Sequence, residues 1–144
     1  MNLLKVADVP ATTVTSNATV MEAINAMVKN RVGAVAVVDQ DDLKGIFTER
    51  DVMLRVVRAK RDPEKTKMSE VMTTDVKTVP AEMAWTEALA LMIEHHFRHL
   101  PITDHQNRVL GMLSIRNLLQ RRVEDLSREL ESVDAYLTAD GIGG

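Results

Sequence analysis

Cysteine is absent from this chain of 144 residues. Its absence excludes disulfides, thiol nucleophiles and thiolate metal sites, and it fits a reducing compartment. No apolar run approaches the roughly 18 residues of a membrane span, and the N-terminus lacks the basic and apolar regions of a secretion signal. The net charge of −3 creates no overall field that attracts nucleic acid or an anionic membrane. We therefore expect a cytoplasmic protein with no membrane partner.

The chain also lacks the short motifs that commonly carry catalysis. It contains no Gly-x-x-x-x-Gly-Lys-Ser/Thr loop, no Gly-x-Ser-x-Gly turn and no His-Glu-x-x-His pair. We therefore predict that the protein is not an enzyme and that it requires no catalytic cofactor.

The feature that stands out is a repeat. Residues 13–52 and 78–118 share one order of helical pattern, apolar run, polar turn and glycine-centred ending. Equivalent positions are 65 residues apart before the turn and 66 after it, as Glu22 and Glu87, and Gly45 and Gly111, illustrate. Only two copies are present, which indicates a duplicated subdomain. Each copy is too small to bury a good core alone, so we expect them to pack face to face and leave clefts between equivalent surfaces.

The residue pattern predicts the order β-α-β-β-α within each copy. Apolar residues at helical spacing follow a capping box formed by Thr19 and Glu22, and Gly33 is expected to end that helix. The second copy repeats the pattern behind a weaker cap, Ala84. The elements expected in the first copy are strands at 13–15, 34–38 and 43–48, and helices from 20 and over 49–60.

A charged, aperiodic linker over 61–67 separates the copies. The predicted domains are 1–62, 63–122, and a C-terminal helix with a flexible tail over 123–144. Within this last region apolar residues alternate at spacings of four and three, which is typical of a helical seam. The seam either packs on a second subunit or folds back on its own domain. Its members are Leu119, Val123, Leu126, Leu130, Val133 and Leu137.

Four short segments carry a resemblance to a known family. They are GIFTERD (45–51), GMLSIRN (111–117), FRHLPI (97–102) and SEVMT (69–73). At these places in the repeat they resemble the paired cystathionine-β-synthase (CBS) domain module in its small stand-alone bacterial form. The resemblance extends to about Gln120. It implies an α/β (α+β) fold in which two β-α-β-β-α units are related by a pseudo-twofold axis, followed by a C-terminal helix and dimerised into a disc.

The resemblance also implies a ligand. Such modules bind adenosine-containing compounds, namely AMP, ADP, ATP, S-adenosylmethionine or NAD, in two clefts between the repeats. The family motif Gly-h-x-Thr/Ser-x-x-Asp implies that Thr48 and Asp51, and in the second copy Ser114 and Asn117, contact ribose or phosphate. A hydroxyl and a carboxylate at a helix N-terminus suit a ribose diol and an anion. The alternative is that Thr48 only caps its helix and that Asp51 only favours the helix dipole.

The two clefts are expected to differ. Asn117 carries no charge, which weakens the second ribose site. The resemblance implies that Arg98 and His99 contact phosphate, whereas the first copy has Gly33 and Ala34 at these positions. It also implies that the segments leading into the first strand of each copy border the base, at Thr13, Val14, Ala18, Thr78, Val79 and Ala81.

Other candidate residues favour structural roles. His95 and His99 have the i, i+4 spacing of a metal pair, but no acidic ligand is fixed nearby, so we predict no metal site. The single tryptophan, Trp85, is expected to pack between the repeats. The basic residues of the helix over 49–60 complement its dipole better than they indicate nucleic-acid binding.

We therefore predict a regulatory homodimer that senses an adenosyl ligand and passes its occupancy to an unidentified protein partner by population shift. One alternative is a structural oligomerisation module with empty clefts. The other is a nucleic-acid-binding accessory protein.

Overall fold

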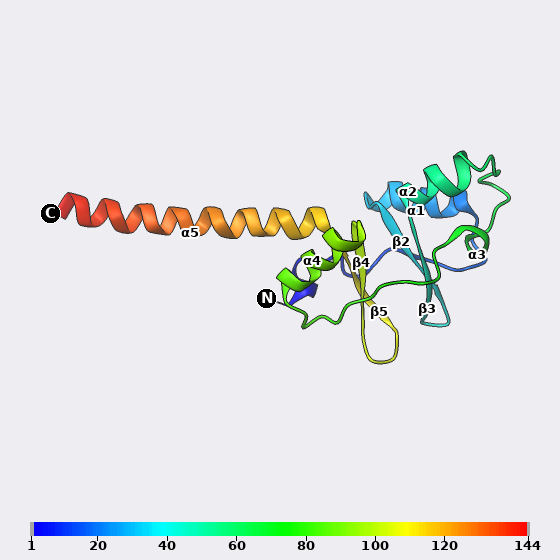
Figure 1. The fold of residues 1–144 in the computed structure, drawn as a ribbon, viewed down its shortest axis with the longest axis horizontal. Helices are drawn as coiled ribbons and strands as arrows, with labels where there is room; N and C mark the ends of the chain where they lie inside the picture. Colours follow the sequence, from blue (N-terminus) through cyan, green and yellow to red (C-terminus); the bar gives the residue numbers. More distant parts are fainter. Residues whose placement is uncertain (1, 144) are drawn as a thin grey trace.

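The computed structural model describes residues 2–143, and side chains for residues 2–137. Strands and helices alternate through two small sheets, and one long helix follows them (Figure 1). This architecture confirms the predicted mixed α and β fold with a C-terminal helix. In chain order the elements are a 3-10 turn (Leu3–Lys5), β1 (Thr13–Val14), α1 (Val20–Asn30), β2 (Ala34–Asp39), β3 (Asp42–Thr48), α2 (Glu49–Asp51) with a π-helix (Val52–Val57), α3 (Met68–Val71), α4 (Trp85–His95), β4 (His99–Thr103), β5 (Val109–Ser114) and α5 (Ile115–Gly143).

The two copies repeat one sheet register. In the first, β1 lies parallel to β2, and β2 is antiparallel to β3. In the second, β4 and β5 form the antiparallel pair, and Val79 makes a parallel bridge to Ile102. Val14 makes the equivalent parallel pair with Val37. The predicted β-α-β-β-α order is therefore present in the first copy, and in the second an isolated bridge at Val79 takes the place of the first strand.

The local signals at α1 were partly right. The Thr19 hydroxyl accepts a hydrogen bond from the backbone N–H of Glu22 at 3.1 Å, as the predicted cap requires. The expected helix stop at Gly33 was wrong, because α1 ends at Asn30 and Arg31 adopts the left-handed conformation with φ 54°. His96 repeats this ending after α4 with φ 58°. An arginine and a histidine thus occupy positions where glycine is the commonest residue.

Each sheet is extended by the segment that leads into the other copy. Asp8 precedes the first copy, yet its backbone exchanges two hydrogen bonds of 3.0 Å with Met112 in β5. Thr73 precedes the second copy and exchanges bonds of 2.9 and 3.0 Å with Ile46 in β3. The two bridges occupy equivalent positions of the repeat. We call residues 8–12 and 73–77 the crossing segments.

Three apolar clusters follow from this exchange. The core of the first copy includes Met68 and Val71 of α3, and the core of the second includes Leu3 from the N-terminus. The first residues of each predicted domain, 1–62 and 63–122, thus pack in the core of the other domain. The third cluster joins the two sheets and confirms the expected face-to-face packing. Its buried members are Ala34, Ala36, Leu43 and Met112.

α5 is one continuous helix that begins in the second copy and projects away from both (Figure 1). The six predicted seam residues are between 44% and 67% exposed, so the seam does not fold back on its own domain. The predicted flexible tail, 138–144, lies outside the described side chains and stays a prediction. Among the described residues, no helix combines the length and apolar character that a bilayer span requires.

The glycine in each repeated motif makes room for a crossing segment. A Cβ at Gly45 would lie 2.8 Å from the Thr73 carbonyl oxygen, and one at Gly111 would lie 3.0 Å from that of Asp8. We predict that Gly45→Ala lowers the free energy of unfolding by about 1–3 kcal/mol, since overpacking against backbone has few ways to relax. Gly111→Ala should cost less. Urea unfolding checks both, with exposed Gln120→Ala as control, and equal stability of all four chains would contradict the prediction.

Candidate functional site

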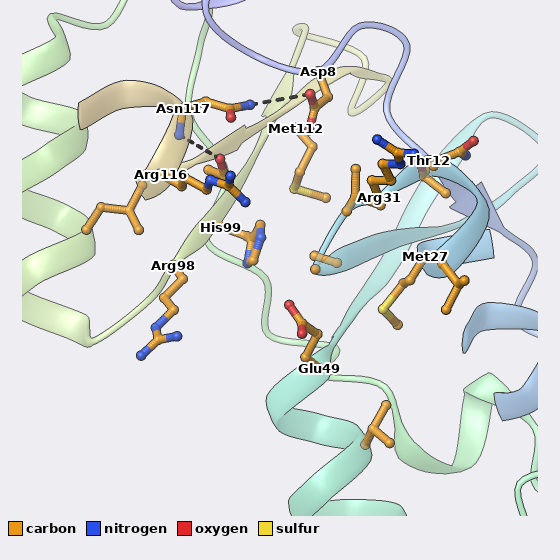
Figure 2. Close-up of a pocket in the computed structure, with 18 of the residues that line it drawn as sticks. Asp8, Thr12, Met27, Arg31, Glu49, Arg98, His99, Met112, Arg116 and Asn117 are labelled. Atoms are coloured by element: carbon orange, nitrogen blue, oxygen red, sulfur yellow. Dashed lines mark hydrogen bonds between the residues drawn. The ribbon is translucent and has the colours of Figure 1, made fainter. Parts of the chain in front are cut away.

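A cleft of about 850 Å³ lies between the two copies. Its walls come from the crossing segment 8–12, from α1 and the start of β2, from the start of the second helix of the first copy, and from β4, β5 and the first turn of α5. Figure 2 shows these side chains converging from both copies. The volume falls within the range of small-molecule sites, about 300–1,000 Å³.

One side of the cleft is apolar. Ile24, Met27, Val28, Val32 and Val52 of the first copy contribute to its lining. Met27 lies on this side, whereas Asn117 lies on the far side (Figure 2). An apolar wall facing a few polar groups is the usual composition of a site for a small organic ligand.

The polar side contains the motif residues of the second copy. Ser114 accepts a hydrogen bond from the backbone N–H of Asn117 at 3.0 Å, so the hydroxyl caps α5. The Asn117 side-chain amide donates to Asp8 Oδ1 at 3.3 Å. Asp8 therefore brings a carboxylate to the position where the second motif lacks one. Sequence reasoning missed Asp8 because it lies before the first repeat.

Three guanidinium groups surround the cleft. Arg98 was predicted, and the structure adds Arg31, from the left-handed end of α1, and Arg116, from the first turn of α5. Among the described residues none of the three forms an ion pair within 4 Å. Unpaired guanidinium groups in a cleft favour an anion with several oxygens, such as phosphate. Arg116 could have been identified from the sequence, because it lies next to Asn117 in the GMLSIRN motif.

His99 lies between charges of both signs. Burial is the main cause that lowers the pKa of its imidazole, Glu49 and Asp8 raise the pKa, and Arg98 lowers it, with a net decrease from the ordinary value. At neutral pH the ring is therefore uncharged and offers one donor and one acceptor. Gly33 leaves room for this arrangement, because a Cβ there would meet both Glu49 and His99.

Thr48 and Asp51 do not line this cleft. They form a reciprocal capping box in which the Thr48 backbone N–H donates to Asp51 Oδ2 at 3.0 Å and the Asp51 N–H donates to Thr48 Oγ1 at 3.3 Å. Arg55 Nε lies 3.6 Å from Asp51 Oδ1. The capping interaction considered as the alternative is thus present, and the ligand-binding role of this pair stays a prediction.

The predicted base-bordering residues also lie outside this cleft. Ala18 belongs to the core of the first copy, and Val79 and Ala81 belong to the core of the second, all at most 8% exposed. Thr13, Val14 and Thr78 are absent from the lining as well, and Thr12 stands in it instead. The border role of these six residues stays a prediction.

Two further interpretations change with the structure. α4 ends at His95, and His96 is left-handed, so His95 and His99 do not share a helix face. Among the described side chains, no three potential metal ligands lie together. Trp85 packs against the core of the second copy, with the Arg122 guanidinium 4.5 Å above its ring, so its expected place between the repeats was wrong.

Comparisons with known proteins agree with this architecture. The family model described as CBS domain matches residues 6–58 and 68–124. The CBS domain-containing protein YhcV of Bacillus subtilis is 38% identical over 115 residues, which cover 80% of this chain and 81% of the relative. A solved CBS-domain structure from Burkholderia ambifaria is 40% identical with a TM-score of 0.76, and it covers 80% of this chain and 84% of that chain.

A more distant structure shares the fold. The CBS domain pair of protein MJ0100, solved in complex with 5′-methylthioadenosine and S-adenosyl-L-methionine, has a TM-score of 0.75 at 22% identity and covers 83% of this chain and 98% of that chain. The repeat, the exchanged sheets and these matches lead to one assignment. The chain belongs to the CBS-domain family and contains a pair of CBS domains.

Proposed function

We propose that the cleft between the two copies binds an adenosine-containing ligand and that the protein is a non-catalytic regulatory sensor. The observation that carries this proposal is one cleft that combines an apolar wall, a hydroxyl, a carboxylate and three guanidinium groups that have no ion-pair partner within the described part of the chain. The adenosyl ligands bound to the MJ0100 domain pair support the same ligand class.

The charges favour ligands that carry phosphate. Of the adenosyl compounds considered, AMP, ADP, ATP and NAD are anionic, whereas S-adenosylmethionine has a sulfonium cation. Arg31, Arg98 and Arg116 outnumber the two carboxylates of the lining, Asp8 and Glu49. An anionic ligand therefore gains from the three guanidinium groups, and a sulfonium does not.

Binding is proposed to act as a signal because both copies contribute to the walls. A ligand that contacts Arg98, just before β4, and the end of α1 stabilises one relative arrangement of the copies over others. An unidentified cytoplasmic partner that fits this arrangement better is then favoured when the ligand is present. The coupling can be no larger than the difference in ligand affinity between the two arrangements.

A thermal-shift panel of AMP, ADP, ATP, NAD, S-adenosylmethionine and adenosine tests the ligand class. At 100 times its Kd a ligand stabilises the folded protein by about 2.7 kcal/mol. We expect clear shifts with the phosphate compounds and smaller shifts with adenosine and S-adenosylmethionine at equal concentration. Absence of any shift at millimolar ligand would contradict the sensor function.

The phosphate contact has its own test. We predict that Arg98→Gln and Arg116→Gln each weaken AMP binding about tenfold, which corresponds to loss of one charge-assisted hydrogen bond of about 1.4 kcal/mol, and change adenosine binding little. Arg122→Gln is the matched control, because Arg122 lies over Trp85 and not in the cleft. Calorimetric titration measures all three, and equal losses for AMP and adenosine would refute the contact.

A specific observation also favours assembly as a second function. Exposed apolar residues occupy equivalent positions of the two copies, namely Val28 and Ile93, Met53 and Leu119, and Val57 and Val123. Such a pseudo-symmetric surface suits an isologous interface. We propose that this surface forms the predicted disc-like homodimer and that the α5 seam continues the interface along the partner.

Introducing negative charges into the α5 seam and into the pseudo-symmetric apolar surface tests the assembly. We predict that Val28→Glu with Ile93→Glu, and Leu126→Glu with Leu130→Glu, each convert a dimer to a monomer, because a buried unpaired carboxylate is costly. Glu131→Lys, outside the seam positions, is the control. Light scattering measures the mass. A wild-type monomer, or a dimer that survives both double substitutions, would overturn this interface.

A further inference from the structure

The two copies carry one carboxylate each at equivalent pairs of positions, but on opposite elements. In the first copy the motif position on the helix is Asp51, and the crossing segment beside its sheet has Thr73. In the second copy the helix position is Asn117, and the crossing segment has Asp8. The acid thus stands on the helix in the first copy and on the crossing segment in the second, where it accepts a hydrogen bond from the helix residue Asn117.

Asp8 is held firmly for a residue so near the N-terminus. Its backbone N–H and carbonyl bond to Met112, both at 3.0 Å, and Gly111 leaves no free space on that side. Its Oδ1 accepts from Asn117 at 3.3 Å. Figure 2 shows this bond on the side of the cleft opposite Glu49. Among the described residues the Asp8 carboxylate has no other hydrogen bond and no ion pair.

A carboxylate fixed in this way retains most of its capacity to accept hydrogen bonds. It has two oxygens with about four acceptor sites, of which Asn117 uses one. The 2′ and 3′ hydroxyls of a ribose are two neighbouring donors, and a carboxylate can accept from both. Asn117 cannot replace it, because the single carbonyl oxygen of an amide is a neutral acceptor.

We propose that Asp8 is the ribose-binding acid of this cleft and that Asn117 is its positioning residue. The inference rests on the proposed binding of an adenosyl ligand and adds the group that recognises the sugar. In the first copy the corresponding acid, Asp51, is engaged by Thr48 and lies beside Arg55. The crossing segment thus supplies the acid that the second motif has lost.

The test compares AMP with 2′,3′-dideoxy-AMP, which lacks both ribose donors, by calorimetric titration. We expect Asp8→Asn to weaken AMP binding at least tenfold and to change dideoxy-AMP binding less than twofold. Asp75→Asn is the matched control, since it removes an exposed carboxylate of the other crossing segment that does not line the cleft, and we expect it to leave both affinities within twofold. Circular dichroism verifies that each variant is folded.

A compensating pair provides the second arm. Asp8→Thr combined with Asn117→Asp reproduces the first-copy arrangement and should restore most of the preference for AMP over dideoxy-AMP that Asp8→Thr alone loses. If the wild-type chain binds AMP, and Asp8→Asn weakens both ligands equally or weakens neither, the ribose role of Asp8 is overturned. The proposed binding of AMP then still stands. A wild-type chain that binds neither AMP nor dideoxy-AMP at millimolar concentration overturns this role together with AMP as the ligand.

Discussion

The exchange of leading segments between the two copies is the constraint on which the rest of the structure depends. Asp8 closes the sheet edge beside β5, and Thr73 closes the edge beside β3. An unpaired strand edge would otherwise expose backbone donors and acceptors. Because each copy completes its sheet with residues that precede the other, neither half is a self-sufficient unit. The glycines of both motifs follow from the same exchange, since they lie under the crossing backbone.

Duplication produced two equivalent frameworks, and side-chain changes made them unequal. On one side Arg31, Arg98 and Arg116 line an open cleft and form no ion pair with any of the described side chains. On the other, Asp51 is engaged by its own helix, and Arg55 donates to the carbonyls of Val71 and Met72.

Much of the fold could be predicted because the patterns are local and occur twice. The N-cap at Thr19, the apolar run of β2 and the hairpin turn were all legible in the sequence. The end of α1 at Arg31 was not, since left-handed arginine is disfavoured locally and tertiary packing must impose it. The motif residues Ser114 and Asn117 were found in the cleft with Arg98 and His99. Asp8 and Thr12 were missed because long-range strand pairing, which no local pattern encodes, brings them there.

α5 begins one residue after Ser114 and continues without a break to Gly143. Its first turn is part of the cleft wall, and its far end lies well beyond both copies (Figure 1). At 1.5 Å per residue its 29 residues form a rod of about 43 Å. By the same geometry a tilt of about 5° at the wall would move the tip by about 4 Å. The length of the helix would therefore amplify a small rotation of the cleft wall into a displacement of several ångströms at its far end.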